Sequence, residues 1–450
     1  MKYLKLLSRT LLGLVFIFSG FVKAVDPLGS AYKFVDYFTA FKLGFLEFLA
    51  LPLGIALAAF ELILGVVLIL GYRRKIMYTI LLWFMLFFTV LTFILAIFNP
   101  VTDCGCFGDA LILTNWQTFL KNVFLMVFVL ILFSGRKKEK GSGQPAREWL
   151  ILSVAYAGLI LFSLWNYRHL PMLDFRPYDV GTVIKEAMEI PDDAPGDEYE
   201  TILVYKNLDD GREQEFSLAD YPKDTIQWKF VSSDSKLIKK GYAPPIHDFA
   251  IMDEYGNNLV EGILADPDYT LLMITKDLEK ANPQALEQAG HWSDLELLAD
   301  DFTFMAVSAS TTEAVQAISS SLGLPYPFLA GDEIMLKTMV RSNPGFMLIS
   351  DGIVLEKWGF RDFPSLSELD PTLLEKLENA AAPISEEEQL LMEAGVYEGF
   401  SFGILEFGSY VPDLIYKKGA SAIEKGVIIS FILGIAGLIA LAALISPIEL

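Results

Sequence analysis

Long runs of apolar residues, separated by short polar segments, fill the first third of the chain, and one more lies near its end. A helix needs about 20 apolar residues to cross the roughly 30 Å hydrocarbon core of a bilayer. Six runs reach or approach this length, the fifth being the shortest. We therefore predict membrane-spanning helices at Leu6–Val25, Phe45–Leu70, Ile76–Phe98, Trp116–Phe133, Trp149–Trp165 and Gly426–Ser446.

Basic residues gather beside alternate ends of these helices, at residues 2–9, 73–75 and 136–147. Segments rich in lysine and arginine stay on the cytoplasmic side of a membrane. The N-terminus is therefore expected in the cytoplasm, and the loops 26–44 and 99–115 and the large segment 166–425 on the outer side. Lysines just before the last helix favour the opposite orientation, but long translocated domains follow the rule weakly.

The charge of the chain is divided between its parts. Residues 1–165 carry a net charge of +7, and residues 166–425 a net charge of −27. So acidic a segment repels nucleic acid and anionic lipid, which argues against nucleic-acid binding. It also contains no cysteine, so it is not a disulfide-stapled domain. The three histidines are scattered and give no metal-ligand spacing.

The acidic segment begins, over residues 166–268, as a linker followed by a β-rich region. Alternating apolar positions and turn residues predict a series of short strands there. These are expected at Thr201–Tyr205, Glu213–Ser217, Thr225–Val231, Phe249–Met252 and Leu259–Leu264.

Residues 269–380 alternate strands and helices, which predicts an α/β sandwich. Apolar runs predict buried strands, and amphipathic stretches predict the helices between them. The strands are Tyr269–Thr275, Phe302–Val307, Phe346–Ser350 and Ile353–Trp358, and the helices are 283–299, Thr312–Leu322, Asp332–Val340 and Ser365–Asn379. Residues 381–425 then form a connector, with a helix at Ser385–Ala394, before the last membrane helix at 426–446.

This element order, with Arg341-Ser342-Asn343-Pro344 before a Asp351-Gly352 hairpin, resembles the thioredoxin fold over about 110 residues. The resemblance implies that Pro344 is the cis proline of that fold. Thioredoxins carry Cys-x-x-Cys after the first strand of this unit, where this chain has Thr275-Lys276-Asp277-Leu278. Without thiols, the domain cannot exchange disulfides itself. A domain kept for binding or packing is the plainer interpretation.

The sharpest motif is Asp103-Cys104-Gly105-Cys106-Phe107-Gly108-Asp109, in the outer loop between the third and fourth helices. It holds both cysteines of the chain. A Cys-x-Cys disulfide closes a small ring, and strained, exposed disulfides tend to be the labile, catalytic ones. Gly105 supplies the backbone freedom such a ring needs, while Asp103 and Asp109 are expected to raise the thiol pKa values. Three interpretations of the motif remain open: redox exchange, a structural pair (an inert disulfide or two buried thiols), and a metal site. Two thiols alone do not complete a zinc site.

The N-terminal part resembles the DoxX/MauE superfamily of bacterial redox-associated membrane proteins over residues 1–135. Arg9, the run Leu12–Gly20 and Lys23 carry the resemblance at its start, and the Cys-x-Cys loop followed by Trp116, Lys121 and Asn122 carries it further on. The resemblance implies a four-helix transmembrane bundle in the bacterial inner membrane, linked to thiol–disulfide or quinone-coupled electron transfer. The layout is similar to a bacterial type in which such a bundle precedes a thioredoxin-like periplasmic region.

Glu61 lies deep in the second predicted helix, far from either end. An ionisable group at that depth costs a few kcal/mol and is by default a functional candidate. Arg9 from the inner side or Lys121 from the outer side could pair with it. Proton transfer to a quinone would use such a carboxyl group. A structural ion pair, or a protonated Glu61 in an interhelical hydrogen bond, is the alternative.

Two functional hypotheses follow. In the first, the chain is a membrane oxidoreductase or a subunit of one. Cys104 and Cys106 exchange with a periplasmic dithiol protein, with Asp103, Gly105, Phe107, Glu61, Arg9 and Lys121 in support and a quinone, not covalently bound, as acceptor. In the second, it is a non-enzymatic membrane anchor or complex subunit whose acidic thioredoxin-like domain binds a periplasmic partner.

Overall fold

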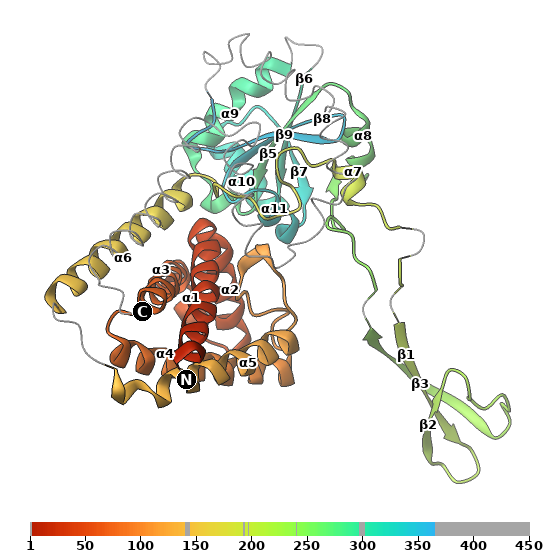
Figure 1. Ribbon diagram of the computed structural model, residues 1–450. Coiled ribbons are helices and arrows are strands. Elements are labelled where there is room, and N and C mark those ends of the chain that lie inside the picture. Colours follow the sequence, from red (N-terminus) through yellow and green to blue (C-terminus); the bar gives the residue numbers. More distant parts are fainter. Residues whose placement is uncertain are drawn as a thin grey trace.

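The computed structural model describes residues 2–139, 145–191, 194–196, 198–239, 241–296 and 302–364. The N-terminal part is a helical bundle, drawn in red to yellow in Figure 1. Among the described residues, five helices are long and apolar enough to cross a membrane. They coincide with the first five predicted spans: α1 (Lys2–Val25), α3 (Ala50–Leu70, preceded by the 3-10 turn η1, Gly44–Leu49), α4 (Arg74–Phe98), α5 (Asn115–Ser134) and α6 (Pro145–Arg168). The predicted sixth span at 426–446 lies outside the described residues.

The bundle is built on a close crossing of α1 and α3. Glycines make this approach possible, because a Cβ atom at Gly20 would lie 2.4 Å from the backbone nitrogen of Leu62, and one at Gly65 would lie 2.6 Å from the carbonyl oxygen of Gly13. Small residues at helix crossings are how membrane helices gain close packing. Large apolar side chains such as Trp83 and Leu130 point outward instead, as expected of surfaces that face lipid.

An additional helix, α2 (Pro27–Ala40), occupies most of the segment predicted as the outer loop 26–44. Asp26 caps it by accepting a hydrogen bond from the Gly29 nitrogen at 2.9 Å, and Pro27 opens its first turn. The helix packs against α3 near the C-terminal end of α1. Hydropathy alone missed it because charged residues interrupt its apolar face.

The α/β domain holds a six-stranded sheet in the order β4-β7-β6-β5-β8-β9. The central strand β5 runs parallel to β6 and antiparallel to β8, and β6 runs parallel to β7. Together with the cis peptide bond between Asn343 and Pro344 before β8, this order is that of the thioredoxin fold, which confirms the predicted fold class. The strands are β4 (Ile251–Met252), β5 (Tyr269–Thr275), β6 (Phe302–Ser308), β7 (Phe328–Gly331), β8 (Gly345–Ser350) and β9 (Ile353–Gly359).

Successive residues of β5 serve two cores, since side chains alternate across a strand. Leu272 and Ile274 face one core, with α8 (Val260–Ala265) and α11 (Glu333–Met339). Leu271 and Met273 face the other, with α9 (Pro283–Glu296). The helix α10 (Thr312–Leu322) packs its partly buried residues on this second side.

Three details differ from the sequence predictions. The strand predicted at 259–264 is instead the helix α8 (Val260–Ala265), in which Val260 and Ile263, three positions apart, are both buried. The short strand β7 was not anticipated. Residues 166–268 are not only a linker and lead-in: Ile184, the first residue of the short helix α7 (Ile184–Ala187), and Tyr178, six residues earlier, are buried in the core of the α/β domain. The predicted closing helix at 365–379, the connector 381–425 and its helix lie outside the described residues.

A second sheet comprises β1 (Glu198–Asn207), β2 (Glu213–Ser217) and β3 (Trp228–Lys239) in the order β2-β1-β3. All its pairings are antiparallel. The predicted third strand, Thr225–Val231, begins three residues too early and ends too soon. Figure 1 shows this hairpin-based sheet drawn apart from the α/β domain.

The α1–α3 crossing yields a test of the bundle. We expect Gly20→Leu to lower the stability of the detergent-solubilised protein by about 1–3 kcal/mol or more, because overpacking forces the two backbones apart. Gly158→Leu in α6, where an added Cβ meets nothing within 4 Å, is the matched control. Thermal unfolding of both variants measures the difference, and equal midpoints would contradict the close crossing.

Candidate functional site

Cys104 and Cys106 lie in the loop between α4 and α5, at the same end of the bundle as the α/β domain. Their sulfur atoms are 2.9 Å apart, and both are free thiols. The Cys104 residue is 8% exposed, and Cys106 is half-buried. Cys106 is therefore the more exposed residue of the pair.

The loop is folded back on itself, which brings the two thiols together. Asp103 pairs with Thr114 in an isolated β-bridge, and its carboxylate accepts a hydrogen bond from the Gly105 nitrogen at 2.8 Å. Gly105 has φ +65°, and a Cβ there would lie 2.7 Å from Cγ of Lys33. Glycine is thus required at this position both by conformation and by space.

The helix α2 holds the loop from one side. The Lys33 ammonium binds the Asp103 carboxylate at 2.6 Å, and the Tyr37 hydroxyl donates a hydrogen bond to the Cys104 carbonyl oxygen at 2.8 Å. Neither contact was anticipated, because α2 was predicted as loop.

Side chains of α1 and α3 form a buried polar cluster that binds the cysteine loop. The Lys23 ammonium lies 2.8 Å from Glu61 Oε2, 2.7 Å from Ser19 Oγ and within hydrogen-bond distance of the Cys106 carbonyl oxygen. These three acceptors match the three hydrogens of a lysine ammonium. The Ser19 hydroxyl also lies 2.7 Å from the Cys106 carbonyl oxygen and 2.8 Å from Glu61.

The predicted partners of Glu61 were wrong. Lys23 pairs with it, and neither Arg9 nor Lys121 does. Arg9 donates to the Ile69 carbonyl oxygen at 3.0 Å, toward the opposite end of the bundle. Lys121 places its ammonium 4.3 Å from the centre of the Phe107 ring. The spacing of Ser19 and Lys23, one helical turn apart in an apolar helix, is the signal that could have revealed the pair.

The charges around the thiols favour a thiolate at Cys106. The hydrogen bond from Cys104 lowers the pKa of Cys106 to about 6, against the effect of burial and with further help from the positive charges of Lys121 and Lys23. The same hydrogen bond, together with burial, raises the pKa of Cys104. We expected Asp103 and Asp109 to raise both values. Instead, Asp103 is neutralised by Lys33, and Asp109 by Arg341 of the α/β domain.

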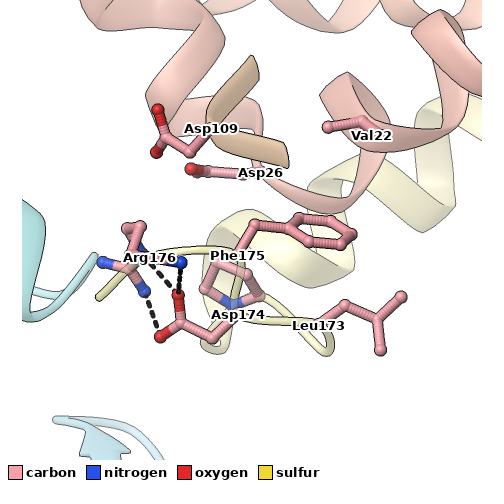
Figure 2. A pocket seen from close by; sticks show the side chains of 8 residues that line it. Val22, Asp26, Asp109, Leu173, Asp174, Phe175 and Arg176 are labelled. Carbon is pink, nitrogen blue, oxygen red and sulfur yellow. Dashed lines mark hydrogen bonds and ion pairs between the residues drawn. The ribbon is translucent and has the colours of Figure 1, made fainter. Parts of the chain in front are cut away.

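The α/β domain meets this end of the bundle through Arg341, three residues before Pro344. The Arg341 guanidinium lies 2.9 Å from Asp26 and 2.6 Å from Asp109. Figure 2 shows Asp26 and Asp109 on the bundle side, facing Asp174 and Arg176 of the segment that enters the domain. The sequence drew attention to Arg341 only as part of the run before Pro344 and not as a contact with the bundle, since its partners are 315 and 232 positions away.

No group of three or more histidine, cysteine or acidic residues with metal-binding geometry occurs in the described part of the chain. The thiols are flanked by ammonium groups and by carboxylates already engaged in ion pairs. The arrangement suits sulfur chemistry that uses a thiolate and a neighbouring thiol.

Comparison with known proteins bears on the bundle first. Residues 1–135 match the family model of the methylamine utilisation protein MauE. Together with the five apolar helices, this match identifies the chain as a multi-pass membrane protein. Residues 199–240, which cover nearly all of the second sheet, match a domain of unknown function, DUF8463. No curated protein matches the chain.

Solved structures resemble the α/β domain. One is the solution structure of a proposed protein disulfide isomerase from Bacteroides thetaiotaomicron, with 15% identity and a TM-score of 0.22, covering 30% of this chain and 84% of that one. Another is the bacterioferritin comigratory protein of Xanthomonas campestris, described for alkyl peroxide reduction, with 11% identity and a TM-score of 0.21, covering 30% and 92%. Such low scores support no inference, so the fold assignment rests on the strand order given above.

The electrostatics of the thiol pair can be tested through Lys121. We expect the rate of Cys106 alkylation by iodoacetamide to reach half its maximum near pH 6 in the unaltered protein. Lys121→Met should shift this midpoint upward, by about one pH unit, because a positive charge that favours the thiolate is removed. Lys42→Met, at an exposed position between α2 and η1, should leave it unchanged. Identical profiles for Lys121→Met and the unaltered protein would contradict the assignment.

Proposed function

We propose that the protein is a membrane-embedded thiol–disulfide oxidoreductase that exchanges disulfides at Cys104 and Cys106. The observation that carries the proposal is the pairing of a buried thiol, Cys104, with a half-buried one, Cys106, their sulfur atoms 2.9 Å apart. A low thiol pKa makes a good leaving group, and a nearby second thiol completes exchange. The match of residues 1–135 to MauE is compatible with this role.

The exchange starts from the Cys104–Cys106 disulfide and a dithiol protein. A thiolate of the partner attacks the sulfur of Cys106, the S–S bond breaks, and Cys104 leaves with the electron pair and takes up a proton. The partner's second thiolate then attacks its own sulfur in the mixed disulfide. Cys106 leaves as a thiolate, which its low pKa favours. The partner departs as a disulfide, and the pair remains as one thiol and one thiolate.

Restoring the disulfide requires an acceptor of two electrons and two protons. A membrane quinone is the class we propose. It would take the two electrons of the pair, the proton of Cys104 and one proton from the medium, and leave as a quinol. The loop joins the end of α4 to the start of α5, two helices long and apolar enough to cross a membrane, which supports a lipid-soluble acceptor.

We further propose that the protein lies in a bacterial inner membrane with the site and the α/β domain in the periplasm. Basic residues support this orientation, since they gather at the end of the bundle opposite the thiols. There Lys5 and Arg74 both bind Glu139, at 2.8 and 3.2 Å. The positive-inside rule assigns that end to the cytoplasm, and an oxidising periplasm suits disulfide chemistry.

Single cysteine variants separate the two roles. In Cys104→Ser, the Cys106 thiolate should still attack a partner disulfide and should therefore accumulate a mixed disulfide that reductant dissolves. Cys106→Ser should trap none, because Cys104 is shielded and its pKa is raised. Non-reducing electrophoresis of membranes followed by mass spectrometry measures the adducts. Equal trapping by both variants would contradict the assigned roles, and no adduct with either would favour a non-enzymatic anchor.

A further inference from the structure

The face of the α/β domain that lies next to the cis proline is occupied by the bundle. Three cations of this face surround the ring of Tyr32 in α2. Lys337 lies 5.0 Å, Arg341 5.3 Å and Lys276 5.6 Å from its centre. Lys276 follows β5, at the position where a thioredoxin would begin its Cys-x-x-Cys segment. The domain thus docks on α2, the same helix that holds the cysteine loop through Lys33 and Tyr37.

The second half of this contact reaches the cysteine loop itself. Arg341 is buried, with 7% of the residue exposed, and joins Asp26 at the start of α2 to Asp109, three residues after Cys106. The two aspartates that flank the motif are therefore held by different elements. Asp103 is bound by Lys33 of α2, and Asp109 is bound by Arg341 of the α/β domain.

Both sides of this contact keep partners of their own. Asp26 still caps α2 through the Gly29 nitrogen, and Arg341 still donates to the Lys337 carbonyl oxygen at 2.6 Å within its own domain. A cavity of about 10 Å³, lined in part by Asp26, Asp109 and Arg176, lies between the two parts. Polar, imperfectly packed contacts of this kind are typical of domains that separate.

The docked state also contains an interaction that opposes docking, the burial of Lys276 near other positive charges. Burial, together with the charges of Arg341, Arg176 and Lys337, lowers the pKa of Lys276 to about 7, against a smaller effect of Asp26. No described residue forms an ion pair with Lys276. A contact that served only to stabilise the fold would gain from a neutral side chain here.

We propose that the α/β domain is a gate over the Cys104–Cys106 site, closed by Arg341 between Asp26 and Asp109 and opened when a dithiol protein takes the domain's place. The proposal rests on the proposed thiol exchange, because a gate matters only if a protein-sized reactant must reach Cys106. In the closed state, small molecules reach the half-buried Cys106, whereas a folded protein does not.

The gate is tested by the size dependence of Cys106 alkylation in the full-length protein in lipid nanodiscs. We expect Arg341→Gln to raise the rate constant for a maleimide carrying a large polymer by about tenfold or more, since loss of one partner from a buried ion pair is strongly destabilising. The rate for N-ethylmaleimide should change little. Arg212→Gln, which removes an exposed arginine on the turn between β1 and β2, is the control and should change neither rate.

The double variant Asp26→Asn with Asp109→Asn opens the same contact from the bundle side and leaves the α/β domain untouched. It should reproduce the effect, which guards against misfolding of the Arg341 variant. Equal rates for the two reagents in the unaltered protein, or unchanged large-reagent rates in both variants, would overturn the gate. The measurement requires no exchange activity, so a failure of the proposed function would appear only in the adduct-trapping experiment.

Discussion

The ion pair between Lys23 and Glu61 is the constraint on which the thiol site depends. Two opposite charges in the apolar interior are costly to bury and are tolerated only with good geometry and satisfied hydrogen bonds. Here Glu61, Ser19 and the Cys106 carbonyl oxygen use all three hydrogens of the ammonium. Because one of these acceptors belongs to the cysteine loop, the loop completes the hydrogen bonding of the buried Lys23 ammonium. The same contact places a positive charge beside the Cys106 thiol, so the stability of the bundle and the chemistry of the thiol are coupled.

The helix α2 connects this buried pair to the soluble part. Its N-cap residue, Asp26, binds Arg341. Tyr32 lies in the middle of the helix, beneath three cations of the α/β domain. Lys33 and Tyr37 bind the cysteine loop. A displacement of the α/β domain therefore acts on the helix that supports the thiols. Contacts of this kind give a physical route by which docking can alter the reactivity of Cys106 without any direct contact to its sulfur.

Hydropathy predicted the membrane helices well because each needs a long apolar run, and it predicted β5 because all but its first residue are buried. It missed α2, where Lys33 and Asp36 interrupt the apolar pattern. The cysteine motif was evident because only one residue separates the two cysteines in the sequence. The partners were not, since Lys23 meets Glu61 across a helix crossing and Arg341 meets Asp109 across two domains. Periodicity gives the face of each helix, but it does not give the register between helices.

The different roles proposed for the bundle and the α/β domain follow from the positions of the cysteines and of the lysines near them. A thioredoxin-type fold usually brings a thiol to the end of its central strand, and here that place holds Lys276, which cannot exchange disulfides. The thiols instead lie in the bundle, where the hydrogen bond from Cys104, with help from Lys121 and Lys23, lowers the pKa of Cys106. The fold is then free to use its face around Pro344 for docking alone. Arg341 binds a carboxylate only three residues from Cys106, so under the proposed gating a partner that replaces the domain would arrive beside that sulfur, and recognition and chemistry would share one small surface.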